Sequence, residues 1–133
     1  MINKPIKAVT EFHKAFGLSV EYKPKADLTS EITELRYNLM KEENDEYLQA
    51  VKSNDLVEIG DALGDMLYIL CGTIISHGFQ DKIEALFDEI QRSNMSKLGD
   101  DGKPIYREDG KVLKGPNYFK PDIEKILKKP NQL

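Results

Sequence analysis

The stretch LMKEENDEY, residues 39–47, decides how the fold of this chain is interpreted. At about 100° per residue, a helix through it places Glu43 and Glu46 on the same apolar stripe as Leu39. Glu42 lies at the edge of that stripe. An ionised carboxylate in a protein core is costly unless a positive group compensates it. Either the helix rotates or ends early so that these acids are solvated, or they face a bound cation.

The next predicted helix, residues 55–76, carries a second acidic stripe. Asp55 and Glu58 have the spacing of a capping box, so Glu58 fits a capping role as well as a ligand role. Glu58, Asp61 and Asp65 lie within about 60° of one another, and a solvent-facing stripe is the alternative to a shared site. The opposite face is apolar and is expected to pack in the core; it comprises Leu56, Ile59, Leu63, Leu67 and Leu70.

If the two acidic stripes converge, their carboxylates share one pocket. Like charges about 4 Å apart repel by a few kcal/mol at an effective dielectric of about 20, so such a cluster needs a cation. All-oxygen ligands favour Mg²⁺, Mn²⁺ or Ca²⁺ over zinc, and the two histidines, His13 and His77, are isolated in the sequence. We therefore predict a site for one of these hard divalent cations. Its candidate ligands are Glu42, Glu43, Glu46, Glu58, Asp61 and Asp65.

The rest of the chain predicts an all-α fold of four to five helices. Besides residues 55–76, apolar periodicity and capping signals predict helices over residues 5–17, 29–51 and 83–93, with a short terminal helix in PDIEKIL, residues 121–127. Two Asp-Gly turn signals follow residue 93, and the second predicts a small β-hairpin around Asp109 and Gly110. We expect one domain over residues 1–133, with a helical core at about 4–92 and a hairpin and tail at about 93–133.

Composition limits the class of protein. The formal net charge is −4 and the pI is near 5.2, so the chain has no basic field that would attract nucleic acid or an anionic membrane surface. The first residues lack a signal-peptide pattern, and the longest apolar run, residues 66–75, is too short to cross a bilayer. The single cysteine, Cys71, excludes an internal disulfide. We expect a soluble cytoplasmic protein.

At this point the acidic motifs resemble those of a known family. EENDE, residues 42–46, followed by EIGDALGDMLY, residues 58–68, is similar to the signature of the all-α nucleoside triphosphate pyrophosphohydrolases, which include MazG-like enzymes, phosphoribosyl-ATP pyrophosphohydrolase and dimeric dUTPases. FHKAFG at residues 12–17 and the segment 93–127 resemble the MazG-related, phosphoribosyl-ATP-pyrophosphohydrolase-like subgroup with dUTP-hydrolysing members. The resemblance implies a helical bundle completed by dimerisation, as a homodimer or homotetramer.

The resemblance also implies Mg²⁺-dependent cleavage between the α- and β-phosphates of a nucleoside triphosphate. It thereby selects Mg²⁺ for the predicted cation site, with Mn²⁺ as a substitute. In the first motif it assigns ligand positions to Glu42, Glu43 and Glu46. In the second motif, Glu58 and Asp61 match the family's Glu-x-x-Asp. The DMLY context instead aligns Asp65 with the usual aspartate and leaves Ala62 where its glutamate would stand. All three acids of this motif therefore remain candidates.

The spacing of the first motif suggests how the roles divide. Glu42 and Glu46 are one helical turn apart and could hold the same ion, which leaves Glu43 as the preferred catalytic base. The exchange of Glu42 and Glu43 stays open, because helical phase places Glu43 deeper. Phe12 and Phe16 could stack on a nucleobase, but their helical spacing favours core packing.

Substrate contacts are expected in the segment after residue 93. The resemblance points to Asn94 and Lys97 near the nucleotide and to Lys114 on a phosphate, although charged loop residues are usually just solvated. The resemblance ranks dUTP first as substrate and other non-canonical triphosphates second. The alternative function is a helical regulatory protein that binds metal or nucleotide without turnover.

Overall fold

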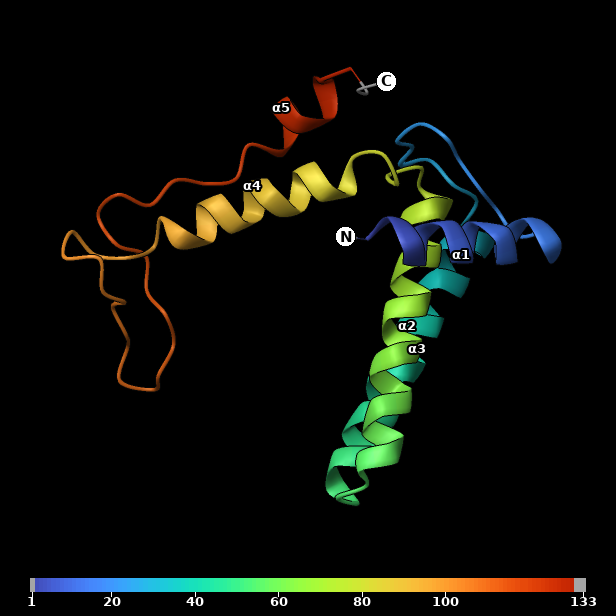
Figure 1. Cartoon of the computed structure of the whole chain (residues 1–133), viewed down its shortest axis with the longest axis horizontal. Helices are drawn as coiled ribbons and strands as arrows, with labels where there is room; N and C mark the ends of the chain where they lie inside the picture. Colours follow the sequence, from blue (N-terminus) through green and yellow to red (C-terminus); the bar gives the residue numbers. More distant parts are fainter. Residues whose placement is uncertain (1, 131–133) are drawn as a thin grey trace. The chain divides into compact units, whose positions relative to one another are not determined.

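The computed structural model describes residues 2–130, and the chain divides into two compact units, Met1–Gln80 and Asp81–Leu133. The single domain expected over residues 1–133 stays a prediction. Figure 1 shows the helices of both units. The first unit contains α1 (Asn3–Ala15), α2 (Ser30–Lys52) and α3 (Leu56–Ser76), and the second contains α4 (Ile83–Met95) and α5 (Ile123–Lys128). The predicted all-α class is confirmed.

Helices α2 and α3 form an antiparallel hairpin that carries both acidic motifs (Figure 1). The reversal takes three residues, with Asn54 in the left-handed region at φ 51°. The Asp55 carboxylate then accepts a hydrogen bond from the Glu58 backbone N–H at 3.1 Å and caps α3. At the other end, the Thr29 hydroxyl caps α2 by accepting from the Ile32 N–H at 3.3 Å. Both predicted N-caps are present, and the short turn fixes α2 beside α3.

The core of the first unit lies where α1 packs against the C-terminal half of α3. Val9 of α1 is 2% exposed, and Cys71 and Ile75 of α3 are fully buried. The loop after α1 is fastened to the end of α3, because the Glu21 N–H donates to the Ile75 carbonyl at 3.0 Å. This core holds α3 by its C-terminal half, whereas the half that carries the acids packs against α2.

The predicted core face of α3 is wrong for the single chain. Leu56, Leu63, Leu67 and Leu70 are exposed, at 82%, 51%, 46% and 46%. Their helical phase was predicted correctly, but α2 packs on the neighbouring flank, where Ala50 and Ala62 are buried, and does not cover the leucines. We call these four residues the leucine stripe. By length and composition alone, α3 could cross a membrane. This is weak evidence for a membrane span, because core helices of soluble proteins meet the same criteria.

The second unit packs α5 and the long preceding loop against α4. The buried Ser93 hydroxyl donates to the Phe119 carbonyl at 2.8 Å, and the Arg92 guanidinium lies 4.2 Å from the centre of the Phe119 ring. The predicted hairpin is reduced, within residues 2–130, to one antiparallel bridge between Tyr106 and Val112. The turn at Gly110 forms with φ 87°, but an isolated two-stranded ribbon gains little stability and no strands extend from it in this part of the chain.

Candidate metal centre

Three carboxylates from the two acidic motifs meet between α2 and α3. One oxygen each of Glu43, Glu46 and Asp65 lies within 4.8 Å of the others. Glu43 and Asp65 are half-buried, whereas Glu46 is exposed. The two acidic stripes therefore converge, and Asp65 is the acid of the second motif that reaches this cluster. We call these three residues the carboxylate cluster.

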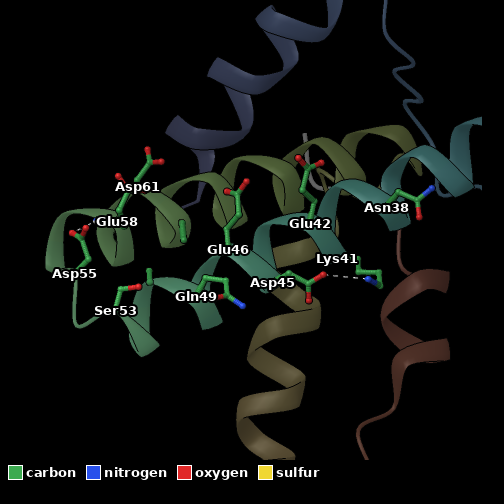
Figure 2. Close-up of a pocket in the computed structure, with 12 residues that line it drawn as sticks. Asn38, Lys41, Glu42, Asp45, Glu46, Gln49, Ser53, Asp55, Glu58 and Asp61 are labelled. Atoms are coloured by element: carbon green, nitrogen blue, oxygen red, sulfur yellow. Dashed lines mark hydrogen bonds and ion pairs between the residues drawn. The ribbon is translucent and has the colours of Figure 1, made fainter.

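Glu46 also faces a groove of about 780 Å³ between the N-terminal half of α3 and the C-terminal half of α2. Glu42, Glu58 and Asp61 line this groove with it. In Figure 2 the side chains of Glu42, Glu46 and Asp61 extend from the two helices to the same side. The remaining three predicted ligands therefore line a groove that also contacts the carboxylate cluster through Glu46.

Not every acid near the groove is available to a ligand. Asp45 accepts a hydrogen bond from Lys41 at 3.2 Å on the surface of α2, and Asp55 is committed to the cap of α3 (Figure 2). Both carboxylates already have hydrogen-bond partners within the chain. The acids of the carboxylate cluster, by contrast, form no ion pair within residues 2–130.

Glu43 carries the electrostatic cost of the cluster. Desolvation, a hydrogen bond with Glu46 and repulsion from the Glu46, Asp65 and Glu42 charges raise the pKa of Glu43 from 4.5 to about 7. Its Oε2 atom is buried and has no hydrogen-bond partner among the described residues. A buried acceptor without a donor is rare in native proteins, and a cation would satisfy it.

The residues present fit a divalent cation. The cluster offers three carboxylates with one orphaned oxygen, and all of its candidate ligand atoms are oxygens. Hard cations such as Mg²⁺, Mn²⁺ and Ca²⁺ prefer this donor set, whereas structural zinc sites use cysteine and histidine. The carboxylate cluster is therefore a candidate site for a hard divalent cation.

The raised pKa of Glu43 gives a testable dependence of stability on pH. Without metal, the folded state holds a proton on Glu43 that the unfolded chain releases near pH 4.5, so folding stability should fall as pH rises from about 4.5 through about 7. Melting in a chelator between about pH 5 and pH 8 should show a decline that Glu43→Gln reduces. Added Mg²⁺ should raise the melting temperature more at pH 8 than at pH 5. A wild-type decline that the variant fully retains would contradict this assignment.

The predicted substrate contacts lie in the second unit. The Lys97 N–H donates to the Asn94 carbonyl at 3.1 Å, and the Lys97 carbonyl accepts from the Gly115 N–H at 2.9 Å. A Cβ on Gly115 would lie 2.5 Å from the Leu98 carbonyl oxygen, so the residue after Lys114 is pressed against this turn. Lys97 and Lys114 therefore belong to adjoining segments. Their placement against the carboxylate cluster stays a prediction.

The prediction that Phe12 and Phe16 pack in the core is wrong. Phe12 is 38% exposed and Phe16 is 68% exposed, and their ring centres are 4.4 Å apart. Phe12 also meets Tyr68 of α3 edge to face at 5.7 Å. Helical spacing gave the correct face of α1, but Val9 and His13 occupy the contact with α3 and leave the two rings at the surface.

The sequence interpretation missed Arg36. This residue is 6% exposed, and its guanidinium donates to the Ile69 carbonyl at 2.9 Å and to the Thr73 hydroxyl at 3.2 Å. The available signal was its position seven residues before Glu43, on the same face of α2. His13 is also buried, and its Nδ1 pairs with the Ser19 carbonyl at 2.8 Å.

Similarity to known proteins covers much of the chain. The family model described as phosphoribosyl-ATP pyrophosphohydrolase matches residues 9–94. The chain is 41% identical over 69 residues to the uncharacterised protein L479 of Acanthamoeba polyphaga mimivirus, a match that covers 50% of this chain and 28% of the viral protein. The crystal structure of a provisionally named NTP pyrophosphohydrolase from Exiguobacterium sp. 255-15 is 27% identical, covers 90% of each chain and superposes with a TM-score of 0.48.

Proposed function

The chain belongs to the phosphoribosyl-ATP pyrophosphohydrolase family, and from this premise we propose that it hydrolyses a nucleoside triphosphate to the nucleoside monophosphate and pyrophosphate. The observation that carries the proposal is the carboxylate cluster with its orphaned, buried Glu43 oxygen. Cleavage between the α- and β-phosphates requires that a highly charged substrate approach acidic side chains. A bound divalent cation removes this conflict.

Glu43, Glu46 and Asp65 would hold Mg²⁺, with Mn²⁺ as a substitute. When bound, the ion neutralises phosphate charge and lowers the pKa of the attacking water. Glu58 and Asp61, which line the adjoining groove, would supply further carboxylate ligands there. The exposed position of Glu46 leaves it shared between the cluster and this groove.

For the catalytic base the geometry supports Glu42, which is the reverse of the preference for Glu43 drawn from the sequence spacing. Glu43 lies within 4.8 Å of both other acids of the cluster, which favours a ligand role. Glu42 lines the groove outside the cluster and would accept the proton of the attacking water. The pKa of Glu43 near 7 would also suit a general base, so Glu43 is the alternative assignment.

The substrate is proposed to be dUTP or another non-canonical deoxynucleoside triphosphate. Lys97 and Lys114 offer ammonium donors from adjoining segments, and Asn94 an amide for the nucleotide. The exposed rings of Phe12 and Phe16 have faces available for stacking. This choice of base and sugar rests on the sequence resemblance.

The active form is proposed to be a homodimer or homotetramer of single-domain chains working in the cytoplasm. The leucine stripe supports association, since it exposes four large apolar side chains on one face of α3. A second hairpin of α2 and α3 packed on this stripe would complete a four-helix bundle. Monomeric soluble proteins rarely leave such a contiguous patch open.

The direct test is a panel of canonical and non-canonical nucleoside triphosphates with and without Mg²⁺, with product identification. We expect nucleoside monophosphate and pyrophosphate, formed only with the metal and fastest from dUTP. Release of inorganic phosphate would contradict the cleavage point. Stabilisation by nucleotide without any product would favour the regulatory binding protein instead.

A further inference from the structure

Arg36 is an unusual buried charge at the contact between α2 and α3. Arginine is seldom fully buried unless it is paired, yet Arg36 is 6% exposed and forms no ion pair with a carboxylate within residues 2–130. Its hydrogen bonds go to the other helix of the hairpin, to the Ile69 carbonyl and the Thr73 hydroxyl. The Thr73 hydroxyl itself donates to the Ile69 carbonyl at 3.0 Å. The guanidinium of α2 is therefore anchored on one turn of α3.

Gly72 makes room for this anchor. A Cβ at Gly72 would lie 2.5 Å from Arg36 Nη2 and 2.8 Å from His13 Nε2, so any side chain there would displace one of them. The His13 ring closes the site from α1, and burial, together with the Arg36 charge, lowers the pKa of His13. His13 is thus a neutral neighbour, and its other ring nitrogen is held by the Ser19 carbonyl. Three helices and one glycine accommodate a single guanidinium.

The anchor and the carboxylate cluster belong to one register of the hairpin. Arg36 lies seven residues before Glu43 on α2, and Gly72 lies seven residues after Asp65 on α3. In an antiparallel pair, a step of seven residues forward on one helix and seven residues back on the other leads from one facing pair to the next. The Arg36–Gly72 contact and the Glu43–Asp65 pair are therefore set by the same register. Seven residues are close to two full turns, so both contacts also use the same faces of the helices. A slip of one turn would separate both pairs together.

Repulsion inside the carboxylate cluster opposes this register when no cation is bound. The facing surfaces near the cluster offer little shape to resist a slip, because Ala50 and Ala62 are the buried side chains there. A planar guanidinium with fixed donor directions resists sliding better than apolar contacts, since its hydrogen bonds are lost at any other register. The directions of the guanidinium hydrogen bonds therefore specify the position of α2 along α3.

We propose that Arg36, seated on Gly72, is a positioning residue that sets the register of α2 against α3 and so brings Glu43 and Asp65 within reach of the same divalent ion. This inference rests on the proposed function for the identity of the ion, and on the contacts of Arg36 for the positioning role. It assigns Arg36 no contact with the substrate or the metal.

The test compares Mg²⁺ and Mn²⁺ binding, by titration calorimetry, in wild type, Arg36→Met and Gly72→Ala. Loss of a residue that orients metal ligands typically weakens binding about 10- to 100-fold, and we expect this loss in both variants. Arg36→Met should keep or raise the melting temperature, because replacing an unpaired buried charge by an apolar side chain of similar length removes a desolvation cost. Arg36→Lys should also bind the metal ions weakly, since a lysine ammonium lacks the planar, paired N–H donors of the guanidinium.

A double-substitution cycle separates positioning from general destabilisation. Gly72→Ala should weaken metal binding in the wild-type background and add less to Arg36→Met, because the guanidinium, which is the group nearest the added methyl at 2.5 Å, is already absent and only the His13 Nε2 contact at 2.8 Å remains. Arg107→Met, an exposed arginine, and Gly60→Ala, a glycine of α3 with open space around it, serve as controls and should bind metal like wild type.

The possible outcomes distinguish this inference from the proposed function. Wild type that binds no divalent cation would overturn both the metal site and the role of Arg36. Wild type that binds metal, with unchanged affinity in Arg36→Met and Gly72→Ala, would overturn the positioning role alone. Independent, additive losses in the two variants would also contradict it, because a shared register predicts coupling.

Discussion

An Asp65→Asn variant is expected to lose pyrophosphate release by at least about a thousandfold at saturating Mg²⁺, because the bound ion supplies several kcal/mol of transition-state stabilisation and each 1.4 kcal/mol is tenfold in rate. Asp65 is the carboxylate of α3 that meets Glu43 and Glu46. An amide keeps the shape of the side chain but not the charge, so metal affinity should fall with the rate. Steady-state kinetics and metal titration of the same sample would measure both.

Substitutions of Glu43 and Glu42 should distinguish the metal ligand from the catalytic base. Glu43→Gln is expected to lose metal binding and activity while making the metal-free protein more stable at pH 8, because it removes a repelled, partly desolvated carboxylate. Glu42→Gln should bind metal normally and lose kcat. The reverse pattern would return the base to Glu43.

Asp45→Asn is the matched control for these variants. Asp45 lies on the same helix and pairs with Lys41 at the surface, so its substitution should leave metal binding and rate unchanged. Full activity in Asp65→Asn, with its fold retained, would contradict the assignment of the metal centre to the carboxylate cluster.

Local signals predicted the helices well. The hydroxyl of Thr29 and the carboxylate of Asp55 cap α2 and α3 where expected, and α3 ends at Ser76 as predicted. These signals act over one turn of helix, so they can be read from a single sequence. The appearance of Glu43 on an apolar stripe was equally local, and it pointed to the hairpin contact where the carboxylates converge.

The partners of each face could not be predicted in the same way. Helical phase placed Glu58, Asp61 and Asp65 on one side of α3. Phase does not tell which of them lies opposite Glu43 of α2 along the helix axis. Asp65 meets Glu43 because of the register of the hairpin. That register involves Arg36 and Gly72, which lie two turns away and carry no motif of their own. Contacts between helices depend on such distant pairs.

The leucine stripe shows the same limit for contacts between chains. Its periodicity predicts that the stripe is covered, but a single sequence cannot say whether the cover is another helix of the same chain or a second copy. The short turn at Asn54 folds α2 onto the flank of α3, so α2 leaves the stripe uncovered. The exposure of Leu63 and Leu67 is the observation on which the proposed association of two copies rests.

The double substitution Leu63→Glu with Leu67→Glu is expected to convert the protein to monomers and to lower its melting temperature. These side chains are 51% and 46% exposed, so about half of each remains to be buried on association. Leu63 and Leu67 of two copies make four leucines at a two-fold contact. At about 1 kcal/mol for each half-buried leucine, they contribute about 4 kcal/mol, or about a thousandfold in dissociation constant. Burying glutamates adds a further penalty. Sedimentation velocity over a range of concentrations would measure the change.

Val57→Glu is the control for this experiment, because Val57 is 78% exposed and lies about 100° around α3 from Leu56, off the stripe. It should leave the wild-type assembly intact. Wild type that sediments as a monomer at high concentration would contradict the association itself. A double variant that stays associated would instead place the contact on another surface. Because the stripe faces away from Asp65, monomeric protein should retain the carboxylate cluster, so a loss of metal binding in this variant would show that association also holds the two helices in register.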